Sequence, residues 1–382
     1  MLFSEILGQE HIKSHLTKSA DAGRIPHAQL FIGAEGSGTL PMAIAYAQYV
    51  LCSNAGGENT AGNTACNLKF EHFAHPDLHF VFPVSSNSDV KSHPVSANFI
   101  KQWREFITQT PYGSLFDWYK KIDIANKQGQ IGVDEAQEIM KSLSLKAYEG
   151  GYKIMIIWAA DKMNIATSNK LLKLLEEPPA KTVFLLIAES QDDIMQTILS
   201  RCQVLNFAGL SEKVICNALT AQHGTDQKAA MKIAHQAQGN YSKALHLLNK
   251  DDDGLPFEEW FVQWVRAAFR AKGNAAAIQD LISWSDSIAG IGREAQKQFL
   301  HFCIDMFRQA LLLNYNAKDL VFIEPSVEKF KLENFAPFVN GNNINDIFKE
   351  LSDALYHIER NGNAKIILTD LSIKLTRLIH KK

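Results

Sequence analysis

A glycine-rich loop near the N-terminus is the first stretch whose residue types could do chemistry. The loop reads GAEGSGTL, and its glycines are Gly33, Gly36 and Gly38. It follows an apolar run, residues 28–32, and in such a strand-loop-helix setting backbone amides can cradle phosphate groups. ATP hydrolysis also needs a lysine for the phosphates and a hydroxyl for Mg²⁺, but Thr39 and Leu40 stand at those positions. The sequence therefore predicts a tight turn that does not hydrolyse ATP.

The acidic groups that would work with such a loop are missing as well. A buried strand is predicted over 152–158, and a nucleotide-driven motor carries carboxylates for Mg²⁺ and water at the end of this strand. Trp158 and Ala159 stand there instead, and Asp161 lies only in the neighbourhood. We expect no functional cofactor site in this region.

One cationic side chain that could take part in catalysis remains. It is Arg201, in the run Ser200-Arg201-Cys202. It follows a short helix predicted over 194–199. An arginine at a helix end usually caps the last carbonyls or pairs with a surface carboxylate. Position alone favours this structural role.

The cysteines predict neither a disulfide framework nor a closed metal site. They are Cys52, Cys66, Cys202, Cys216 and Cys303. A zinc knuckle using Cys52 and Cys66 would need two more thiolates, but Thr60 and Asn63 occupy the intervening spacings of three. The alternative is a mixed site with nearby histidines, whose spacing matches no trusted zinc pattern. Those histidines are His72, His75 and His79. We expect a degenerate, metal-free module.

Composition describes an ordinary soluble protein of two or three domains. The chain has 382 residues, of which 46% are hydrophobic and 21% charged, and its formal net charge is −2. This charge gives no general attraction to nucleic acid. The longest apolar runs, such as 182–188, are too short to span a membrane, and the N-terminus does not resemble a signal peptide. A cytoplasmic location is expected.

The elements that must position these residues alternate between strands and helices. Strands are predicted over 28–32, 152–158 and 182–188, with an amphipathic helix over 163–177 that Pro178 and Pro179 stop. This alternation predicts an α/β core with a parallel sheet and flanking helices. A polar insertion with many aromatic residues, 85–129, is expected to pack on that core in preference to binding nucleic acid.

The remaining chain is predicted to be helical. Three short helices are expected over 211–222, 226–238 and 241–249, followed by an acidic linker at 251–254. Long amphipathic stretches then follow to the C-terminus. The expected domains are an α/β core (1–208), a small helical lid (209–250) and an all-α domain (255–382).

Several segments in combination resemble the clamp-loader branch of the AAA+ ATPases over residues 1 to about 250. They are GRIPHA at 23–28, the glycine loop, NKLLKLLEEPP at 169–179 and SRC at 200–202. The run 363–371 is similar to the last helix of the collar through which such subunits form a ring. The resemblance implies an α/β AAA+ core, a lid and a helical collar used for oligomerisation.

The same resemblance gives Arg201 a second role. It implies a subunit that does not hydrolyse ATP but offers the arginine of its SRC motif, flanked by Ser200 and Cys202, to a nucleotide on the neighbouring subunit. Ser190 and Lys243 lie near the family's sensor positions. Cys52 and Cys66 fall at the outer ligand positions of the family's zinc module. The implied partners are the ATPase subunits (gamma/tau) and the delta subunit of bacterial DNA polymerase III, and the sliding clamp and primed DNA through the complex.

Two alternatives remain open. One is a self-sufficient AAA+ ATPase, such as the motor subunit of a clamp loader or a branch-migration helicase, for which positions 39, 40, 158 and 159 would need different side chains. The other is a direct DNA-binding module. It would use a helix starting near Asp134, with Lys141 and Lys146, to follow phosphates.

Overall fold

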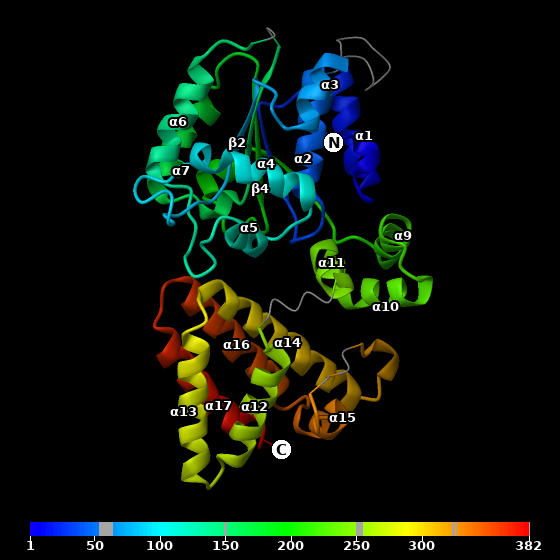
Figure 1. Cartoon of the computed structure of the whole chain (residues 1–382), viewed down its shortest axis with the longest axis vertical. Helices are drawn as coiled ribbons and strands as arrows, with labels where there is room; N and C mark the ends of the chain where they lie inside the picture. The colour runs from blue at the N-terminus through cyan, green and yellow to red at the C-terminus, as the bar shows by residue number, and fades with distance from the viewer. Residues whose placement is uncertain (53–63, 149–150, 250–254, 323–324, 326, 382) are drawn as a thin grey trace. The chain divides into compact units, whose positions relative to one another are not determined.

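The chain folds as two compact units. The computed structural model describes residues 1–52, 64–148, 151–249, 255–322, 325 and 327–381 (Figure 1). One unit comprises residues 1–124 and 129–250, and the other comprises residues 125–128 and 251–382. The expected boundary at residue 208 falls inside the first unit. The expected linker at 251–254 lies outside the described residues.

A five-stranded parallel sheet forms the centre of the first unit. In spatial order its strands are β2 (Leu78–Val81), β3 (Lys153–Ile157), β4 (Thr182–Ala188), β1 (Ala28–Ile32) and β5 (Gln203–Asn206). Leu30 of β1 is in register with Leu186 of β4 on one side and Val204 of β5 on the other. Strands β1, β3 and β4 are buried along their whole length, as their continuous apolar runs predict, whereas the edge strand β5 is partly exposed. The expected parallel α/β core is confirmed.

Helices cover both faces of this sheet (Figure 1). Those that precede the lid are α1 (Glu10–Asp21), α2 (Thr39–Cys52), α3 (Thr64–Glu71), α4 (Ile100–Gln109), α5 (Leu115–Lys121), α6 (Val133–Ser144), α7 (Ile165–Glu176) and α8 (Gln196–Leu199). One apolar cluster contains Leu16 of α1, Ile44 of α2 and Trp103 of α4. The cluster on the other face contains Ile139 of α6 and Leu171 of α7. The two clusters hold the sheet between helical layers.

The aromatic insertion belongs to this core. Helices α4 and α5 lie within the expected range 85–129, and both Trp103 and Trp118 are completely buried. The indole nitrogen of Trp118 donates a hydrogen bond to the carbonyl of Pro83 at 2.8 Å. The expectation that these aromatic side chains pack and do not form an exposed nucleic-acid surface is confirmed.

The lid is a small helical bundle within the first unit. It consists of α9 (Glu212–His223), α10 (Gln227–Ala237) and α11 (Tyr241–Asn249). The side chains of Ser211 and Asp226 accept hydrogen bonds from the first backbone N–H groups of α9 and α10, which fixes where these helices begin. The apolar cluster of the bundle includes Tyr112, which precedes α5 in the core.

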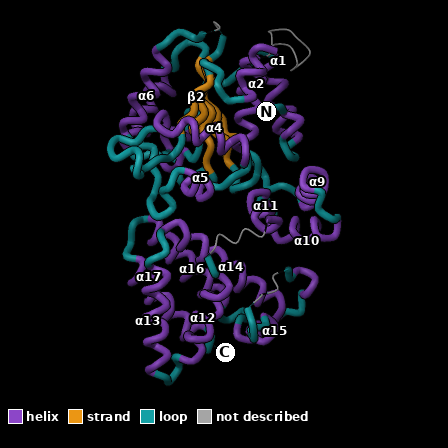
Figure 2. The backbone as a smooth tube through the Cα atoms, viewed as in Figure 1, coloured by secondary structure: helices purple, strands orange, loops and turns teal. Residues whose placement is uncertain are grey.

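The second unit is helical throughout its described part (Figure 2). Its α-helices are α12 (Phe257–Arg270), α13 (Ala275–Ala289), α14 (Arg293–Asn314), α15 (Leu332–Phe335), α16 (Ile344–Glu359) and α17 (Ala364–Leu378). Trp264 of α12 and Trp284 of α13 stack in its core with ring centroids 5.0 Å apart. The sequence pattern did not predict α13 as a separate helix.

Short 3₁₀ helices complete the described elements. They are η1 (Phe3–Glu5), η2 (Ser96–Phe99), η3 (Ala160–Lys162), η4 (Lys318–Leu320) and η5 (Ala336–Phe338). Residues 6–9 separate η1 from α1. A search of the described helices finds none with the length and apolar character needed to cross a membrane.

Candidate functional site

The glycine loop between β1 and α2 is closely packed by protein. Gly36 and Gly38 have φ angles of 71° and 94°, which side chains other than glycine rarely adopt. A Cβ atom on Gly36 would lie 2.1 Å from Oδ1 of Asn240, and one on Gly33 would lie 2.6 Å from Oγ of Ser37. The tight turn that the sequence predicted accounts for Gly36 and Gly38, and the close neighbours of Gly33 and Gly36 leave no room for a larger side chain there.

The beginning of helix α11 makes direct hydrogen bonds to this loop. The backbone N–H of Tyr241 donates to the carbonyl of Gly36 at 3.2 Å, and Nδ2 of Asn240 donates to Oε1 of Glu35 at 3.1 Å. The Oδ1 atom of Asn240 also accepts from the backbone N–H of Lys243 at 2.9 Å. The lid helix is therefore attached to the loop by the amide nitrogen of Asn240 and by the main chain, while the amide oxygen of Asn240 caps the first turn of the helix.

Glu35 adds an acidic group to the same contact. Burial raises the pKa of Glu35, an effect that the hydrogen bond from Asn240 and the positive charge of Lys243 partly oppose. A carboxyl group beside a phosphate-binding loop disfavours an anionic ligand whenever it is ionised. Lys243, near the expected second sensor position, thus interacts electrostatically with this glutamate.

Tyr112, which belongs to the aromatic insertion, packs against the glycine loop. Its hydroxyl accepts a hydrogen bond from the backbone N–H of Leu7 at 2.8 Å, and its ring makes an edge contact with Tyr241 at a centroid distance of 5.1 Å. A Cβ atom on Gly38 would lie 3.2 Å from this ring. Burial raises the pKa of Tyr112 well above its ordinary value, so the hydroxyl stays neutral.

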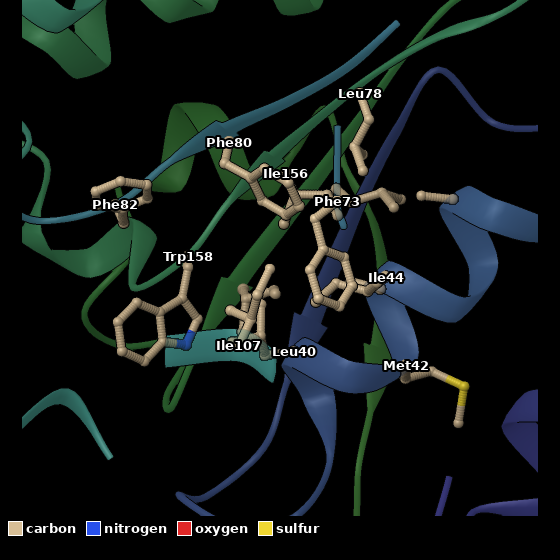
Figure 3. Packing of buried hydrophobic residues seen from close by; sticks show 14 of the residues in the cluster. Leu40, Met42, Ile44, Phe73, Leu78, Phe80, Phe82, Ile107, Ile156 and Trp158 are labelled. Carbon is tan, nitrogen blue, oxygen red and sulfur yellow. The ribbon is translucent and has the colours of Figure 1, made fainter. Parts of the chain in front are cut away.

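The positions that would bind Mg²⁺ belong to the hydrophobic core. Leu40 is 3% exposed, Trp158 is 8% exposed, and both are members of one apolar cluster (Figure 3). The ring centroid of Trp158 lies 5.1 Å from that of Trp103 and 5.9 Å from that of Phe106. Nearby Asp161 pairs with Lys162 at 2.8 Å. A magnesium ion at this place would be surrounded by hydrocarbon.

Arg201 lies at the surface, one residue beyond the C-cap of α8. Its Nη1 donates to the carbonyl of Thr197 at 2.8 Å and to Oγ of Ser200 at 3.3 Å, and its Nη2 donates to Oε1 of Glu176 at 2.5 Å. The side chain is 34% exposed. The capping role and the surface ion pair that position alone favours are therefore both present.

The flanking residues of Arg201 differ in exposure. Ser200 is exposed and donates its hydroxyl to the carbonyl of Thr197 at 3.1 Å. Cys202 is half-buried, and burial raises the pKa of its thiol to about 11, which makes it a poor nucleophile at neutral pH. Ser190 accepts a hydrogen bond from the backbone N–H of Asp192 at 3.2 Å, just after β4.

Two of the cysteines are paired, contrary to what the sequence predicted. Cys52 and Cys66 form a disulfide with Cα atoms 5.4 Å apart, so the expectation of no paired cysteines is wrong for these two. Helix α3 places Cys66 beside the end of α2, a tertiary contact that the sequence spacing does not reveal. Bonded sulfur atoms are not available as zinc thiolates. Thr60 and Asn63 lie outside the described residues.

The histidines near this disulfide do not complete a metal site. Within the described ranges, no three His, Cys, Asp or Glu side chains are grouped as metal ligands. His75 is buried against Phe70, with ring centroids 5.4 Å apart, and its Nδ1 accepts from the backbone N–H of Asp77 at 3.1 Å. This hydrogen bond lies in the turn directly before β2.

Sequence reasoning missed the residues that fasten the lid to the loop. Asn240 precedes a helix, and an asparagine there is an ordinary N-cap signal. Nothing in the linear sequence indicates that its amide would also reach Glu35, or that Tyr112 would meet Tyr241. Such contacts arise only when α11 and the insertion are brought to the same end of the sheet.

The parallel sheet, its glycine loop and the three helices of the lid define an α/β core with a small helical lid. The family model described as DNA polymerase III, delta subunit, matches residues 8–211, which is more than half of the chain. The chain belongs to this family.

Curated relatives sharpen the assignment to the delta' type. The chain is 28% identical over 244 residues to DNA polymerase III subunit delta' of Bacillus subtilis, covering 64% of this chain and 60% of that protein. It is 23% identical over 310 residues to the delta' subunit of Escherichia coli, covering 81% and 77%. It is also 26% identical over 253 residues to subunit tau of Bacillus subtilis, covering 65% and 37%.

Solved structures with a similar chain course have low similarity scores. A gamma subunit-related protein of DNA polymerase III from Thermotoga maritima gives a TM-score of 0.38 at 13% identity, covering 97% of this chain and 99% of that one. The RuvB Holliday junction branch migration motor of Thermotoga maritima gives 0.39 at 13% identity, covering 84% of each chain. These scores are too low to assign a role to any residue.

Proposed function

We propose that this chain is a clamp-loader subunit of DNA polymerase III that does not hydrolyse ATP and supplies Arg201 to a nucleotide bound by a neighbouring subunit. The observation that carries the proposal is a difference in burial between two places in the first unit. The positions for the metal ligands lie inside an apolar cluster, whereas the arginine of the SRC motif is at the surface. Membership of the delta-subunit family supports the clamp-loader role.

The interior of the loop region argues against hydrolysis by this chain. Phosphoryl transfer depends on positioned cations that neutralise charge on the phosphates. Leu40 and Trp158 offer neither a hydroxyl nor a carboxylate, so neither side chain can hold a metal ion. We therefore propose a degenerate phosphate loop that serves as a structural turn under the lid.

Arg201 has the chemistry for a role in trans. A guanidinium group is permanently charged and presents several N–H donors to phosphate oxygens. Its present partner, Glu176, is also exposed, so the pair can separate at low cost when a phosphate approaches. An arginine finger of this kind can be worth about three to five powers of ten in rate.

The partners follow from this role. We propose that the chain assembles with gamma/tau ATPase subunits and the delta subunit, and that it acts on the sliding clamp and primed DNA through the complex. The helical second unit would form the collar contacts. Replication would place this work in the cytoplasm, with no cofactor held by the chain itself.

A reconstituted complex tests the trans role. ATPase subunits assembled with the Arg201→Ala chain should hydrolyse ATP more slowly than the wild-type complex in the presence of primed DNA, with the loss confined to the adjoining site. Lys213→Ala, which removes an exposed cation from α9, serves as the control and should leave the rate unchanged. Unchanged turnover with Arg201→Ala in a fully assembled complex would remove the proposed finger.

The self-sufficient ATPase is tested on the isolated chain. The proposal expects no turnover with Mg²⁺ and ATP. Measurable turnover that disappears on Gly36→Asp would restore the alternative.

A direct DNA role for α6 meets an electrostatic obstacle at the start of the helix. Asp134 pairs with His93 at 2.9 Å, and Glu135 accepts from the backbone N–H of Ser96 at 2.7 Å, so acidic groups occupy the first turn. Lys141 and Lys146 are exposed further along the chain. If neutralising both lysines lowers the affinity of the assembled complex for primed DNA and reduces its salt dependence, these lysines contact phosphate.

A further inference from the structure

An open groove of about 920 Å³ lies in the second unit. Helix α12 forms one wall, and the segment from Lys329 through α15 to Phe338 forms the other. Residues of α13 contribute as well. This volume is at the upper end of the range of about 300 to 1,000 Å³ that is typical of ligand pockets.

Positive charge dominates the lining of this groove. Arg266 and Arg270 come from α12, and Lys329 and Lys331 come from the opposite wall. Among the described residues that line the groove, the only carboxylate is that of Asp280, and Glu328 lies 4.0 Å from Lys329. These cations are exposed. Because the chain as a whole carries a net charge of −2, this local excess is a property of the groove and does not follow from a basic protein.

Two contacts hold the basic side chains over the groove. The Nη2 atom of Arg266 donates to the carbonyl of Lys329 at 2.9 Å, which connects the two walls. The Nη2 atom of Arg270 lies 3.2 Å from Oδ2 of Asp280. Lys329 itself has a φ angle of 63°, an uncommon conformation for a residue with a long side chain.

Aromatic side chains line the same groove. Phe269 and Phe338 are 44% and 36% exposed and meet edge to face with centroids 4.9 Å apart. Trp284 and Phe335 also line the groove and are nearly buried. Exposed aromatic rings beside cations suit a ligand that carries both negative charge and a large apolar side chain.

We propose that this groove docks an acidic peptide segment of a partner protein, with glutamates or aspartates facing the cations and one large apolar side chain against Phe269 and Phe338. The charge complementarity selects the acidic partner, and the rings select the apolar anchor. A single nucleic-acid strand fits less well, because the lining includes a carboxylate and the cations form two short walls, not a stripe along a backbone. This inference is independent of the role of Arg201.

The first test uses the full chain and a short fluorescein-labelled peptide of glutamates ending in Leu-Phe. Fluorescence anisotropy should show saturable binding with a Kd on the order of 10 to 100 µM at low salt. Replacing the glutamates by glutamines, or Leu-Phe by Ser-Ser, should weaken binding at least about tenfold. These peptide controls leave the protein unchanged, so a loss cannot come from unfolding. Failure of the original peptide to saturate would overturn the proposal.

Protein variants then locate the site. Lys329→Glu combined with Lys331→Glu should weaken binding about tenfold or more, and Phe269→Ser should weaken it about fivefold. Lys349→Glu, an equal charge change at an exposed position of α16 outside the groove, is the matched control. Equal weakening by Lys349→Glu, or tighter binding of a single-stranded oligonucleotide that depends on the same lysines, would exclude an acidic-peptide site.

Discussion

Arg201 at the end of α8 donates a hydrogen bond from Nη2 to Oε1 of Glu176, the last residue of α7, at 2.5 Å. The two side chains are 34% and 48% exposed, so water screens their attraction. Exposed pairs of this kind contribute about 1 kcal/mol or less to stability. Glu176 therefore fixes the position of the guanidinium group at the surface, but the ion pair is weak enough to separate when another anion approaches.

Replacing Glu176 by glutamine tests how this pair affects the trans role. Glu176→Gln keeps the shape but removes the charge that competes with phosphate for Arg201. We expect ATP hydrolysis by the assembled complex to rise by up to about fivefold, the equivalent of about 1 kcal/mol. Glu177→Gln, a neighbouring exposed glutamate, should have no effect. A fall in turnover would show that Glu176 positions the arginine and does not compete for it.

Leu40 provides a test of the apolar cluster. Leu40→Ser should lower the free energy of unfolding by about 3 to 5 kcal/mol, because it leaves a cavity and buries a hydroxyl among hydrocarbon side chains. Leu40→Met, which conserves volume, should cost less than about 1.5 kcal/mol. Denaturant unfolding measures both. Similar stability of the two variants would mean that the side chain at position 40 is not tightly packed.

Asn240 tests the attachment of the lid. Asn240→Ala removes the hydrogen bond to Glu35 and the cap on the N–H of Lys243, which should cost about 1 to 2 kcal/mol locally. Hydrogen exchange in α11 should accelerate while exchange in β4 stays slow. Asn249→Ala at the other, exposed end of α11 is the control. Equal effects of the two variants would contradict a specific attachment at the loop.

The buried carboxyl group of Glu135 should make the stability of the folded chain depend on pH. Burial raises the pKa of this carboxyl from 4.5 to about 7, although hydrogen bonds from Ser96 oppose the shift. The folded chain therefore binds more protons than the unfolded chain between these values, and the contribution of Glu135 to stability falls as the pH rises through this window. In the wild type, this titration should lower the free energy of unfolding by on the order of 2 to 3 kcal/mol. Because glutamine stays neutral, Glu135→Gln should abolish this decrease.

Denaturant unfolding at several pH values checks this prediction. The difference in stability between Glu135→Gln and the wild type should shift in favour of the variant from about pH 5 to about pH 8. Glu177→Gln, at an exposed position after α7, serves as the reference for a simple loss of charge. Parallel curves for the wild type and Glu135→Gln would exclude a buried carboxyl that titrates near neutrality.

Strong local patterns made much of the fold predictable. The apolar run 182–188 coincides with β4, and the amphipathic pattern ending at Pro178 gave α7 within two residues at its start. Ser211 and Asp226 capped the helices that begin after them, as such residues usually do.

The site was only partly predictable because its decisive contacts join distant residues. The sequence showed that Thr39 and Leu40 replace chemically active groups, but not that Leu40 and Trp158 share an apolar cluster with the insertion. It also could not show that Cys52 and Cys66 meet. Sequence spacing reports neighbours along the chain, whereas these contacts depend on how α2, α3 and α4 pack.

The apolar cluster around Leu40 and Trp158 also limits which single substitutions this region tolerates. A serine or an aspartate at either position would bury a polar group without a hydrogen-bond partner, so each single change would destabilise the fold. At position 158, a polar side chain would also have to be matched by changes in the aromatic rings that pack against it, those of Trp103 and Phe106. The packing of the core thus makes polar substitutions here dependent on one another.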